Sequence, residues 1–473
     1  MMASGFPRSI FSGVPALPLA WQRAWHEYYR RVMSDDTVSV DAIVVGGGPA
    51  GLAAAMTMAQ QGMEVILIER GEYAGSKNVG GLVYATVLND LIPEAFTKAP
   101  IERPVSRRSI AYLGEDQFMA VDWGADEWAK PPFNHTYIVN RSQFDRWFAK
   151  EVEKAGVNLI EGMVVDDLVY EGEGMNRKVT GVRLRGDEIF KAPVVILAEG
   201  ANCLVTAKAR EALQLRVGKH AQEYAVGVKE IIGLPKEKIQ DRFNLAPHEG
   251  AAMDFVGVPF KGTVGGGFIY TAKEAIHVGA VMRIASLVEA KRNPSEILDV
   301  FKRHPRIAPL IQGGELLEYS AHMLPEGGFS AIGDLTGPGL MIVGDAAGLL
   351  NMSLYKEGTN HAMESGRYAG QTAVEAKKSG DFSRNGLAGY ETRLHGGIAL
   401  KDLRKYSDVP DVLNGSPALF SLYPDKVTRL LVDYFTVSEE PKSETQKKAL
   451  RKFLRDLPKL QFLRDIFRAR KMI

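Results

Sequence analysis

A glycine-rich turn between an apolar run and a helix constrains the fold of this 473-residue chain more than any other feature. Residues 41–51 read DAIVVGGGPAG, so a predicted buried strand leads directly into Gly46, Gly48 and Gly51. In this G-x-G-x-x-G spacing the first glycine allows a tight turn, the second lets the backbone approach a diphosphate, and the third packs helix against strand. The N–H groups and dipole of the expected helix 49–60 favour a phosphate at its start. The segment therefore predicts a dinucleotide site.

An acidic residue closes the next apolar run. Residues 65–68 (VILI) predict a second parallel strand, and Glu69 follows at its end. A carboxylate at this distance from the glycines is placed to accept hydrogen bonds from the ribose hydroxyls of an adenosine. Strand, helix, strand and terminal acid together make the glycine pattern far more specific than it is alone.

The kind of dinucleotide follows from a segment much later in the chain. Residues 340–343 (LMIV) predict another buried strand, which ends in Gly344 and Asp345, and a helix is expected over 358–375. An acid at a strand end beside glycines can bind the ribityl hydroxyls of a flavin, and the next helix N-terminus faces the pyrimidine side of the ring. This order of segments predicts FAD.

Two further segments supply candidate contacts. Residues 194–200 predict a strand that closes in Glu199 and Gly200, and Arg141 precedes an expected helix at 142–155, where it can contact a phosphate or the adenine. With their neighbours, the candidate cofactor-binding residues are Gly46, Gly48, Pro49, Ala50, Gly51, Glu69, Arg70, Arg141, Val165, Glu199, Gly200, Gly344, Asp345, Gly358 and Thr359.

Composition excludes several other classes of protein. The net charge is +1, so nothing draws the chain as a whole toward nucleic acid. The single cysteine, Cys203, excludes an intrachain disulfide and any zinc or iron–sulfur site held by cysteines alone. The nine histidines show no metal-binding spacing, so no metal site is predicted. No segment approaches the ~18 apolar residues needed to span a bilayer.

The middle of the chain predicts an antiparallel region that lies over the flavin. The alternation over 110–122 predicts one half-buried antiparallel strand. Further strands are expected at 164–170, 178–185, 224–232, 265–271 and 276–283. The last three are expected to form a sheet, inserted between the two halves of the FAD site, that builds a substrate or acceptor pocket.

We therefore predict an α/β fold with a Rossmann-like FAD-binding domain of the glutathione-reductase type, interleaved with an antiparallel α+β substrate domain and followed by a helical tail. The expected segments are an N-terminal extension at 1–37, with Met33 as an alternative start; FAD-binding parts at 38–110, 136–221 and 326–380; substrate-domain parts at 111–135 and 222–325; and a C-terminal helical region at 381–473.

The C-terminal tail is basic and amphipathic. Residues 442–473 hold eleven Lys/Arg and three Asp/Glu, on a chain that is otherwise acidic. Apolar residues recur there at helical spacing, with Pro458 dividing two helices: Leu450, Phe453, Leu454, Leu457, Leu460, Phe462, Leu463, Ile466 and Phe467. Such helices favour anionic lipid headgroups, and the alternative is a hairpin docked on the body or on a partner subunit.

The chain resembles the FixC flavoproteins, the membrane-associated subunits of electron-bifurcating electron-transfer-flavoprotein complexes. Their wider kin are electron-transfer flavoprotein:quinone oxidoreductases and geranylgeranyl reductases. The resemblance spans about 38–435 and is carried by residues 46–51, 70–81 (RGEYAGSKNVGG), 99–104, 265–271, 344–348, 356–366, 401–406 (KDLRKY) and 409–411. It implies that Lys77, Asn78, Gly80 and Gly81 also contact FAD.

The resemblance implies partners and a location as well. Electrons would come from FixA/FixB-like subunits of an electron-transfer flavoprotein and pass to a quinone, at the cytoplasmic side of the membrane and without a transmembrane segment. The quinone oxidoreductases carry a four-cysteine [4Fe–4S] cluster that this chain lacks. As in FixC systems, a small ferredoxin-like (FixX-like) partner would supply it.

A quinone needs a dry apolar slot beside the flavin and a few polar groups for its carbonyls. Tyr270, His277, Tyr355 and His361 are candidates, although each could instead be a buried structural group. No nucleophile or acid–base pair is required, because a flavin carries the redox chemistry. The alternative functions are geranylgeranyl-reductase-like reduction of polyprenyl double bonds, FAD-dependent monooxygenation, and a noncatalytic flavin scaffold.

Overall fold

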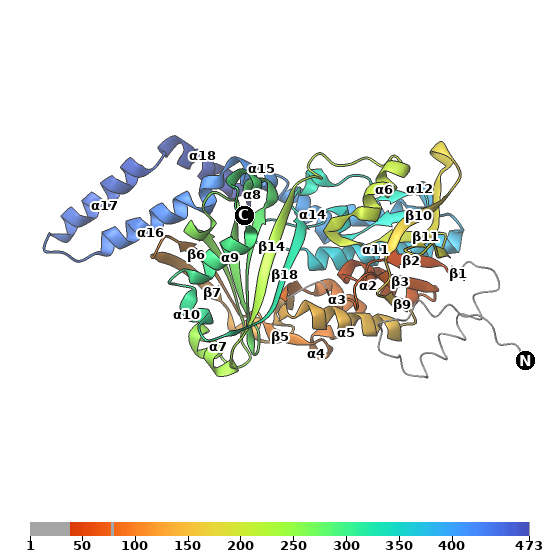
Figure 1. Ribbon diagram of the computed structural model, residues 1–473, viewed down its shortest axis with the longest axis horizontal. Coiled ribbons are helices and arrows are strands. Elements are labelled where there is room, and N and C mark those ends of the chain that lie inside the picture. The colour runs from red at the N-terminus through yellow and green to blue at the C-terminus, as the bar shows by residue number, and fades with distance from the viewer. Residues whose placement is uncertain (1–37, 77–79, 473) are drawn as a thin grey trace, which may run out of the picture.

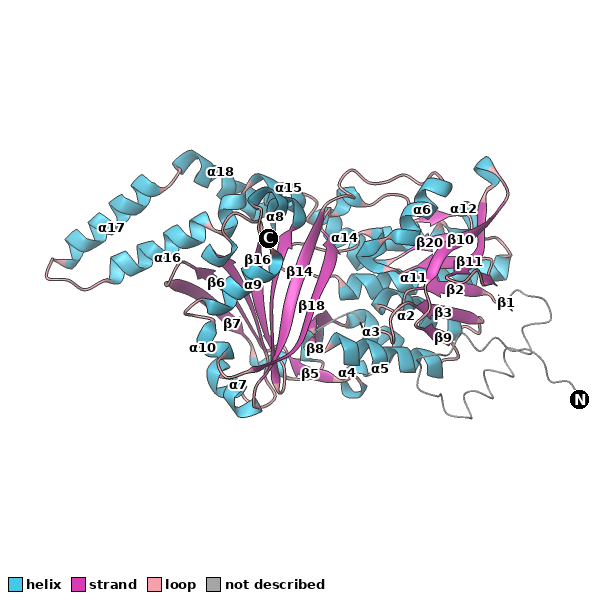
Figure 2. Cartoon of the chain, in the orientation of Figure 1, coloured by secondary structure: helices cyan, strands magenta, loops and turns pink. Residues whose placement is uncertain are grey.

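The computed structural model describes residues 38–76 and 80–472 (Figure 1). The expected N-terminal extension, the alternative start at Met33, and the loop residues Lys77 and Asn78 lie outside this range. Two large sheets form the centres of two adjoining lobes, and the helices of the C-terminal region lie against both (Figures 1 and 2).

The first lobe contains a six-stranded sheet made mainly of buried apolar runs. Its five strands from β20 to β9 are parallel, and β19 is antiparallel to β20. The order is β19 (Thr336–Gly337), β20 (Leu340–Ile342), β13 (Val195–Leu197), β2 (Ala42–Val45), β3 (Val65–Glu69) and β9 (Asn158–Glu161). The central strands are buried throughout, as a parallel sheet covered on both faces requires. The strands predicted from the four apolar runs are confirmed.

Two long helices of this lobe pack against each other. α2 (Pro49–Ala59) follows β2, and α11 (Thr359–Ser379) lies along it. Small residues allow the close approach, since a Cβ on Gly366 would lie 2.0 Å from the carbonyl oxygen of Ala50. Both helices were predicted, as was α5 (Arg141–Lys154), which also contacts α2.

Two small sheets complete this part of the molecule. One has the order β1 (Val38–Ser39), β12 (Ile189–Lys191), β11 (Lys178–Leu184) and β10 (Val165–Glu171). The other has the order β4 (Gly81–Tyr84), β8 (Thr136–Val139) and β5 (Ile101–Pro104). α3 (Thr86–Leu91) and α4 (Ala95–Lys98) lie between β4 and β5 in the chain, and α6 (Leu204–Ala212) follows β13 and contacts β10.

The second lobe is built on a seven-stranded sheet. Its order is β18 (Glu315–Pro325), β14 (Tyr224–Gly233), β17 (Ala275–Arg283), β16 (Gly265–Thr271), β15 (Ala251–Gly257), β6 (Arg107–Leu113) and β7 (Phe118–Gly124). All neighbours are antiparallel except β15 and β6. The helices of this lobe are α7 (Lys236–Phe243), α8 (Ile284–Ala290), α9 (Pro294–Arg303) and α10 (Ala308–Ile311). Phe255, Phe260 and Phe301 pack together between sheet and helices, with ring centroids 5.2 and 5.4 Å apart.

One predicted strand is corrected by the structure. The alternating run 110–122 is not one strand but the two strands of a hairpin, β6 and β7, joined where Gly114 N–H donates to the Gln117 carbonyl at 2.8 Å. The turn residues Gly114, Glu115 and Asp116 interrupt the run, yet its apolar alternation resumes on the far side of the turn. The alternation alone therefore concealed the reversal of direction.

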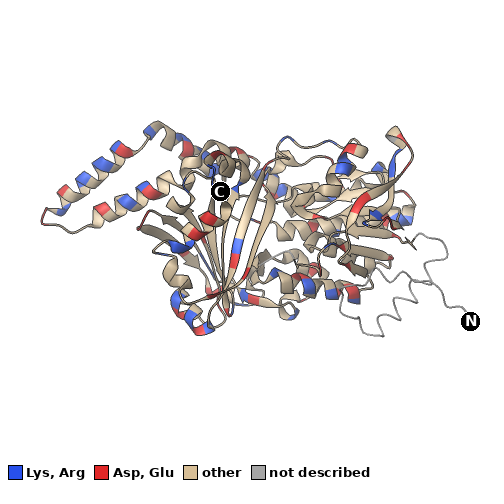
Figure 3. Cartoon of the chain, in the orientation of Figure 1, with Lys and Arg blue, Asp and Glu red and all other residues tan. Residues whose placement is uncertain are grey.

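Helices make up the C-terminal region. They are α12 (Arg384–Leu387), α13 (Gly389–Gly396), α14 (Ile398–Lys405), α15 (Val409–Gly415), α16 (Leu422–Phe435), α17 (Lys442–Asp456) and α18 (Lys459–Ala469). The predicted break between two tail helices at Pro458 is confirmed. α16 and α17 extend side by side away from the body, with Lys and Arg spaced along α17 (Figures 1 and 3).

A buried carboxylate fastens the end of the tail to the body. Asp465 on α18 is fully buried and accepts hydrogen bonds from Ser416 Oγ at 2.9 Å and from Tyr423 OH at 2.8 Å. Arg468 adds a hydrogen bond to the Gly415 carbonyl. Within the described range, no helix is both long and apolar enough to cross a membrane.

Candidate functional site

A cavity of about 560 Å³ connects the glycine turn of the first lobe with the seven-stranded sheet of the second. It brings together most of the residues predicted to bind the cofactor. These lining residues are Gly46, Gly48, Pro49, Ala50, Glu69, Arg70, Gly81, Arg141, Val165, Glu199, Gly200, Gly344, Asp345, Gly358 and Thr359. Gly51 and Gly80 lie behind the lining.

The glycine turn has the shape that a diphosphate needs. Gly46 has φ +111°, and a Cβ there would lie 2.3 Å from the Ala198 carbonyl oxygen. A Cβ on Gly51 would lie 2.0 Å from the Gly46 carbonyl oxygen, so this glycine serves helix packing. At Gly48 a Cβ would meet no atom within 4 Å and would occupy the cavity itself. The residues present therefore fit a bound dinucleotide at the start of α2.

Glu69 holds two turns together at the edge of this cavity. One carboxylate oxygen accepts from Gly47 N–H at 2.7 Å and the other from Gly71 N–H at 2.6 Å. Each oxygen keeps a second lone pair, so the carboxylate can still accept a ribose hydroxyl. Its placement agrees with the predicted role.

An acidic residue, Asp345, and a basic residue, Arg141, also line the cavity. Burial raises the pKa of Asp345 to about 6, and Arg141 counteracts part of that rise. Arg141 is itself held by a bidentate ion pair with the buried Asp145, both contacts being 2.7 Å. The Asp345 turn is fixed in turn by a hydrogen bond of 2.9 Å between Gly344 N–H and Ser365 Oγ.

Glu199 uses its carboxylate for the fold as well as lining the cavity. Its two oxygens accept from Val205 N–H, Thr206 N–H and Thr206 Oγ1 at 2.7–3.0 Å, which caps the start of α6. The strand end 194–200 predicted an acid beside the flavin but gave no sign of this capping.

The four candidate quinone contacts divide into two pairs. Tyr270 and Tyr355 line the cavity. Tyr270 stacks on Phe268 with ring centroids 4.7 Å apart, and burial raises its pKa well above the usual value, so its hydroxyl keeps its proton. His277 and His361 do not line the cavity.

His277 instead supports the loop that carries Gly80. A Cβ on Gly80 would lie 2.0 Å from its ring, and its Nε2 is 2.8 Å from Asn140 Oδ1. Burial and the nearby Lys229 lower the pKa of His277 to about 3, so the ring is neutral. The resemblance placed Gly80 at the cofactor, and here it packs against this imidazole while its carbonyl accepts a hydrogen bond from Lys229.

Several polar residues of the cavity were missed by the sequence analysis. Burial and Arg141 lower the pKa of Lys229 to about 8, and burial with Arg141 lowers that of His322 to about 4. Arg108 donates to Tyr84 OH at 2.7 Å, and both also line the cavity. The only sequence signal was Lys229, which with Glu230 interrupts a mainly apolar strand.

The C-terminal region also contributes to the lining of the cavity. Leu413 on α15, Phe420, and Met472 at the end of the tail supply apolar surface there. Two charged residues, Arg283 and Glu326, line the cavity as well, and Arg283 donates to the Pro410 carbonyl of α15. The lining therefore joins the glycine turn to the C-terminal region, between residues more than 400 positions apart.

These features define a dinucleotide-dependent flavoprotein, and the matching family models agree. One described as FAD dependent oxidoreductase matches residues 41–235, one described as ETF-QO, ubiquinone-binding matches 224–324, and one described as ETF-QO/FixC family C-terminal domain matches 409–473. The protein is an FAD-dependent oxidoreductase.

Comparison with known relatives shows which family of FAD-dependent oxidoreductases the chain belongs to. A probable electron transfer flavoprotein-quinone oxidoreductase, YdiS of Escherichia coli K12, is 42% identical over 417 residues, covering 88% of this chain and 94% of the relative. Protein FixC of the same strain is 41% identical over 422 residues, covering 89% and 95%. Protein FixC of Azorhizobium caulinodans is 38% identical over 432 residues, covering 90% and 97%. The chain belongs to the ETF-QO/FixC family, which confirms the predicted resemblance.

Solved structures support the fold. A geranylgeranyl bacteriochlorophyll reductase-like protein from Thermoplasma acidophilum has a TM-score of 0.66 at 22% identity, covering 92% of this chain and all of that chain. The myxobacterial halogenase CndH has a TM-score of 0.56 at 20% identity, covering 76% and 79%. At these identities the likeness concerns fold alone.

Proposed function

We propose that this protein passes electrons from an electron-transfer flavoprotein to a membrane quinone, as the FixC-like subunit of an electron-bifurcating complex. The observation that supports this most is the continuity of the cavity. The part lined by the glycine turn fits FAD, and Leu413, Phe420 and Met472 add apolar surface that suits an isoprenoid quinone.

Bound FAD supplies the redox chemistry, because it accepts electron pairs and can release them one at a time. Near it, Lys229 Nζ and Arg141 place positive charge at the cavity at pH 7. Tyr270 OH holds its proton and can donate a hydrogen bond to a carbonyl oxygen. His322, kept neutral by its lowered pKa, can accept or donate one. These groups orient an acceptor and stabilise negative charge that develops on it.

The proposed partners follow from what this chain lacks and from its family. With one cysteine it can hold no four-cysteine cluster, so a ferredoxin-like subunit would carry the [4Fe–4S] centre. FixA/FixB-like subunits would deliver the electrons. Two of the relatives named above are FixC proteins, which favours this assembly over a stand-alone reductase of polyprenyl double bonds.

We further propose that the tail lies on the membrane surface. Large apolar side chains are exposed along α16, α17 and α18 and the loop between the first two: Val432, Phe435, Val437, Leu450, Leu454, Leu460, Leu463, Ile466 and Phe467. The same region carries most of the basic residues of the C-terminus (Figure 3). Apolar insertion and attraction to anionic lipids act together on such a surface.

Purification of the native complex tests the assembly. We expect this chain to copurify with two electron-transfer-flavoprotein subunits and an iron-containing partner, and the complex to reduce a short-chain quinone. A chain that purifies alone and reduces prenyl double bonds, without any partner, would contradict the proposal and support the geranylgeranyl-reductase alternative.

A further inference from the structure

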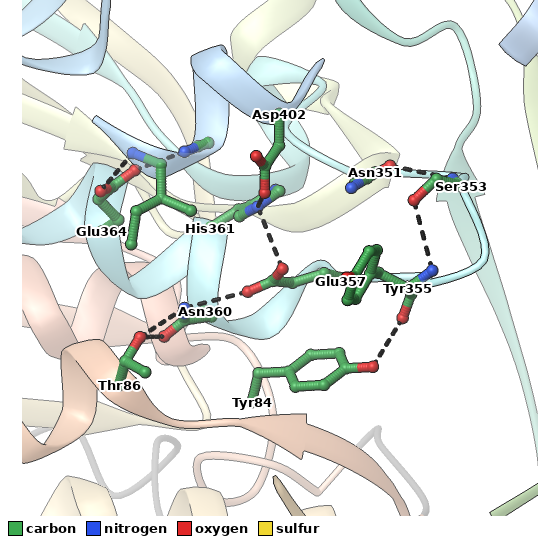
Figure 4. A network of polar contacts seen from close by, with 12 residues as sticks. Tyr84, Thr86, Asn351, Ser353, Tyr355, Glu357, Asn360, His361, Glu364 and Asp402 are labelled. Carbon is green, nitrogen blue, oxygen red and sulfur yellow. Dashed lines mark hydrogen bonds and ion pairs between the residues drawn. The ribbon is translucent and has the colours of Figure 1, made fainter. Parts of the chain in front are cut away.

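Three potential metal ligands meet beside the start of α11, outside the lining of the cavity. Glu357 directly precedes the helix, His361 lies in its first turn, and Asp402 comes from α14 (Figure 4). His361 Nε2 is 3.6 Å from Glu357 Oε2 and 3.9 Å from Asp402 Oδ2. One ligand atom from each residue lies within 4.8 Å of the other two.

The histidine at the centre of this group lacks the partners that a buried imidazole needs. His361 is fully buried, and neither ring nitrogen makes a hydrogen bond to any described residue. The distances from its Nε2 to the two carboxylates exceed the 2.7–3.2 Å range of an N–H···O bond. The ring nitrogen therefore points at the carboxylates across a gap.

The gap has the size that a shared cation produces. Nitrogen and oxygen ligands at about 2.0–2.2 Å from one tetrahedral ion lie about 3.3–3.6 Å from each other. The separations of His361 Nε2 from the two carboxylates lie at the top of this range or slightly above it, and the carboxylates of Glu357 and Asp402 have ligand atoms within 4.8 Å of each other. A movement of a few tenths of an ångström by the partly exposed side chain of Asp402 would bring its carboxylate into this range.

A second set of hydrogen bonds orients Glu357. Its other oxygen, Oε1, accepts from Asn360 Nδ2 at 3.0 Å, and Asn360 is held by Thr86 Oγ1 at 2.8 Å and by Val87 N–H at 3.1 Å (Figure 4). Oε2 is thereby turned toward His361. Fixed outer partners of this kind are typical of residues that coordinate metals.

The charge of the group also favours a cation. Among the described residues, no lysine or arginine forms an ion pair with Glu357 or Asp402. The two carboxylates therefore lie beside the imidazole with no lysine or arginine of the described chain to balance them. Burial raises the pKa of Glu357, and a bound cation would offset the same cost of burying its carboxylate.

We propose that Glu357, His361 and Asp402 bind one divalent transition-metal ion such as Zn²⁺. Mixed imidazole and carboxylate ligands suit Zn²⁺ and its neighbours, and three protein ligands leave one position for water. The ion links α14 of the C-terminal region to the first turn of α11, whose residues Gly358 and Thr359 line the cavity. The ion holds α14 and α11 together, and its role is structural and separate from the redox site.

Metal content and calorimetry test the proposal on the full-length, FAD-loaded protein. After chelator treatment and dialysis we expect Zn²⁺ to bind at one ion per chain and to raise the melting temperature. His361→Gln and Asp402→Asn should each weaken Zn²⁺ binding by about a hundredfold while FAD content stays at the wild-type level. The matched control is Asp411→Asn, which removes an exposed carboxylate from α15 and should bind Zn²⁺ as wild type does.

Two outcomes would overturn the site. One is wild-type protein that shows no saturable one-to-one binding of Zn²⁺, and the other is variants that bind as tightly as wild type. Either result would leave the three side chains as a buried polar cluster that binds no metal. If a variant fails to fold, the wild-type stoichiometry before and after chelation decides the question alone.

Discussion

The glycines at the cavity do different things, and the structure separates them residue by residue. Gly46 and Gly51 are required by the backbone, because a side chain at Gly46 would collide with the carbonyl oxygen of Ala198 after β13, and one at Gly51 with the carbonyl oxygen of Gly46. Gly48 has an ordinary φ of −80°, so a side chain there strains nothing and only fills the space for the diphosphate. Substitution at Gly48 can therefore separate cofactor binding from folding.

We expect Gly48→Val to give soluble protein without FAD, its apoprotein stability changed by less than about 1 kcal/mol. The measurement is the flavin absorbance of the purified variant together with its thermal melting. Gly396→Val, on the exposed surface of α13 where a Cβ also meets no atom, is the matched control and should stay yellow. A Gly48 variant that retains stoichiometric FAD would contradict the assignment of this turn to the FAD diphosphate.

Asp345 gives a pH-dependent prediction. Because its pKa is raised to about 6, the folded flavin-free chain binds this proton more tightly than the unfolded chain does. The resulting stability is present below about pH 4 and is lost as pH rises through 6. Asp345→Asn removes this loss of stability. The free energy of unfolding of the flavin-free variant should therefore exceed that of flavin-free wild type by about 1–3 kcal/mol at pH 7.5 and equal it at pH 4.

Denaturant unfolding of the two flavin-free proteins across pH measures this difference, and FAD titration provides the second readout. The same substitution should weaken FAD binding, since the carboxylate is expected to accept the ribityl hydroxyls. If the variant is no more stable than wild type at neutral pH, burial of the ionised Asp345 carboxylate does not destabilise the flavin-free fold.

At the scale of elements, the tail combines a firm attachment with an exposed apolar surface. Asp465 fastens α18 to the body, so the whole tail is not removed without exposing Ser416 and Tyr423. Charges on α17 are the better target, because their ion pairs, such as Lys452 with Asp433, lie on the surface and contribute little to stability.

We expect the double variant Arg451→Gln with Lys452→Gln to bind anionic vesicles about thirtyfold more weakly than wild type at low salt, given about 1 kcal/mol per basic residue near such a surface. The difference should shrink as salt rises, because screening acts within about 8–10 Å. Lys236→Gln with Lys238→Gln, on exposed α7, is the control with the same loss of charge. Equal pelleting of both doubles with vesicles would assign the tail to a partner subunit instead.

The elements were more predictable than the contacts between them. Continuous apolar runs and the glycines at their ends identified β2, β3, β13 and β20, because a parallel strand buried on both faces has no polar positions to obscure it. The hairpin of β6 and β7 was read as one strand because its alternation continues across the turn. Local pattern carries no information on chain reversal when both arms have the same period.

The site was predictable where backbone shape and sequence coincide. Glu69 and Asp345 follow strands directly, so their place at the cavity followed from the strands. The second lobe contributes Lys229 and His322 from strands whose pairing is not encoded locally, and Glu357 and His361 meet Asp402 only because α14 folds back on α11. Contacts between distant segments were therefore the part that the sequence concealed.

At the scale of the whole molecule, the chain carries a single G-x-G-x-x-G, and its turn lines the cavity that fits FAD. We expect the isolated FAD-loaded protein to show negligible NADH:quinone activity, and electron-transfer-flavoprotein and ferredoxin-like partners to restore quinone reduction by at least about a hundredfold. Stopped-flow absorbance of the flavin measures both. Rapid bleaching by NADH or NADPH alone would favour the monooxygenase alternative.

The strand order of the six-stranded sheet also determines when, during translation, the sheet can be completed. β13 lies between β2 and β20, and β20 begins at Leu340, so the sheet that carries Gly46 and Asp345 cannot close until most of the chain has been synthesised. At translation rates of about 5–20 residues per second, the glycine-rich strand emerges roughly 15–60 s before β20, the last parallel strand of its sheet. Until β20 emerges, β13 exposes an apolar edge and the nascent protein lacks Asp345, so chaperone dependence and cofactor loading should both be concentrated late in translation.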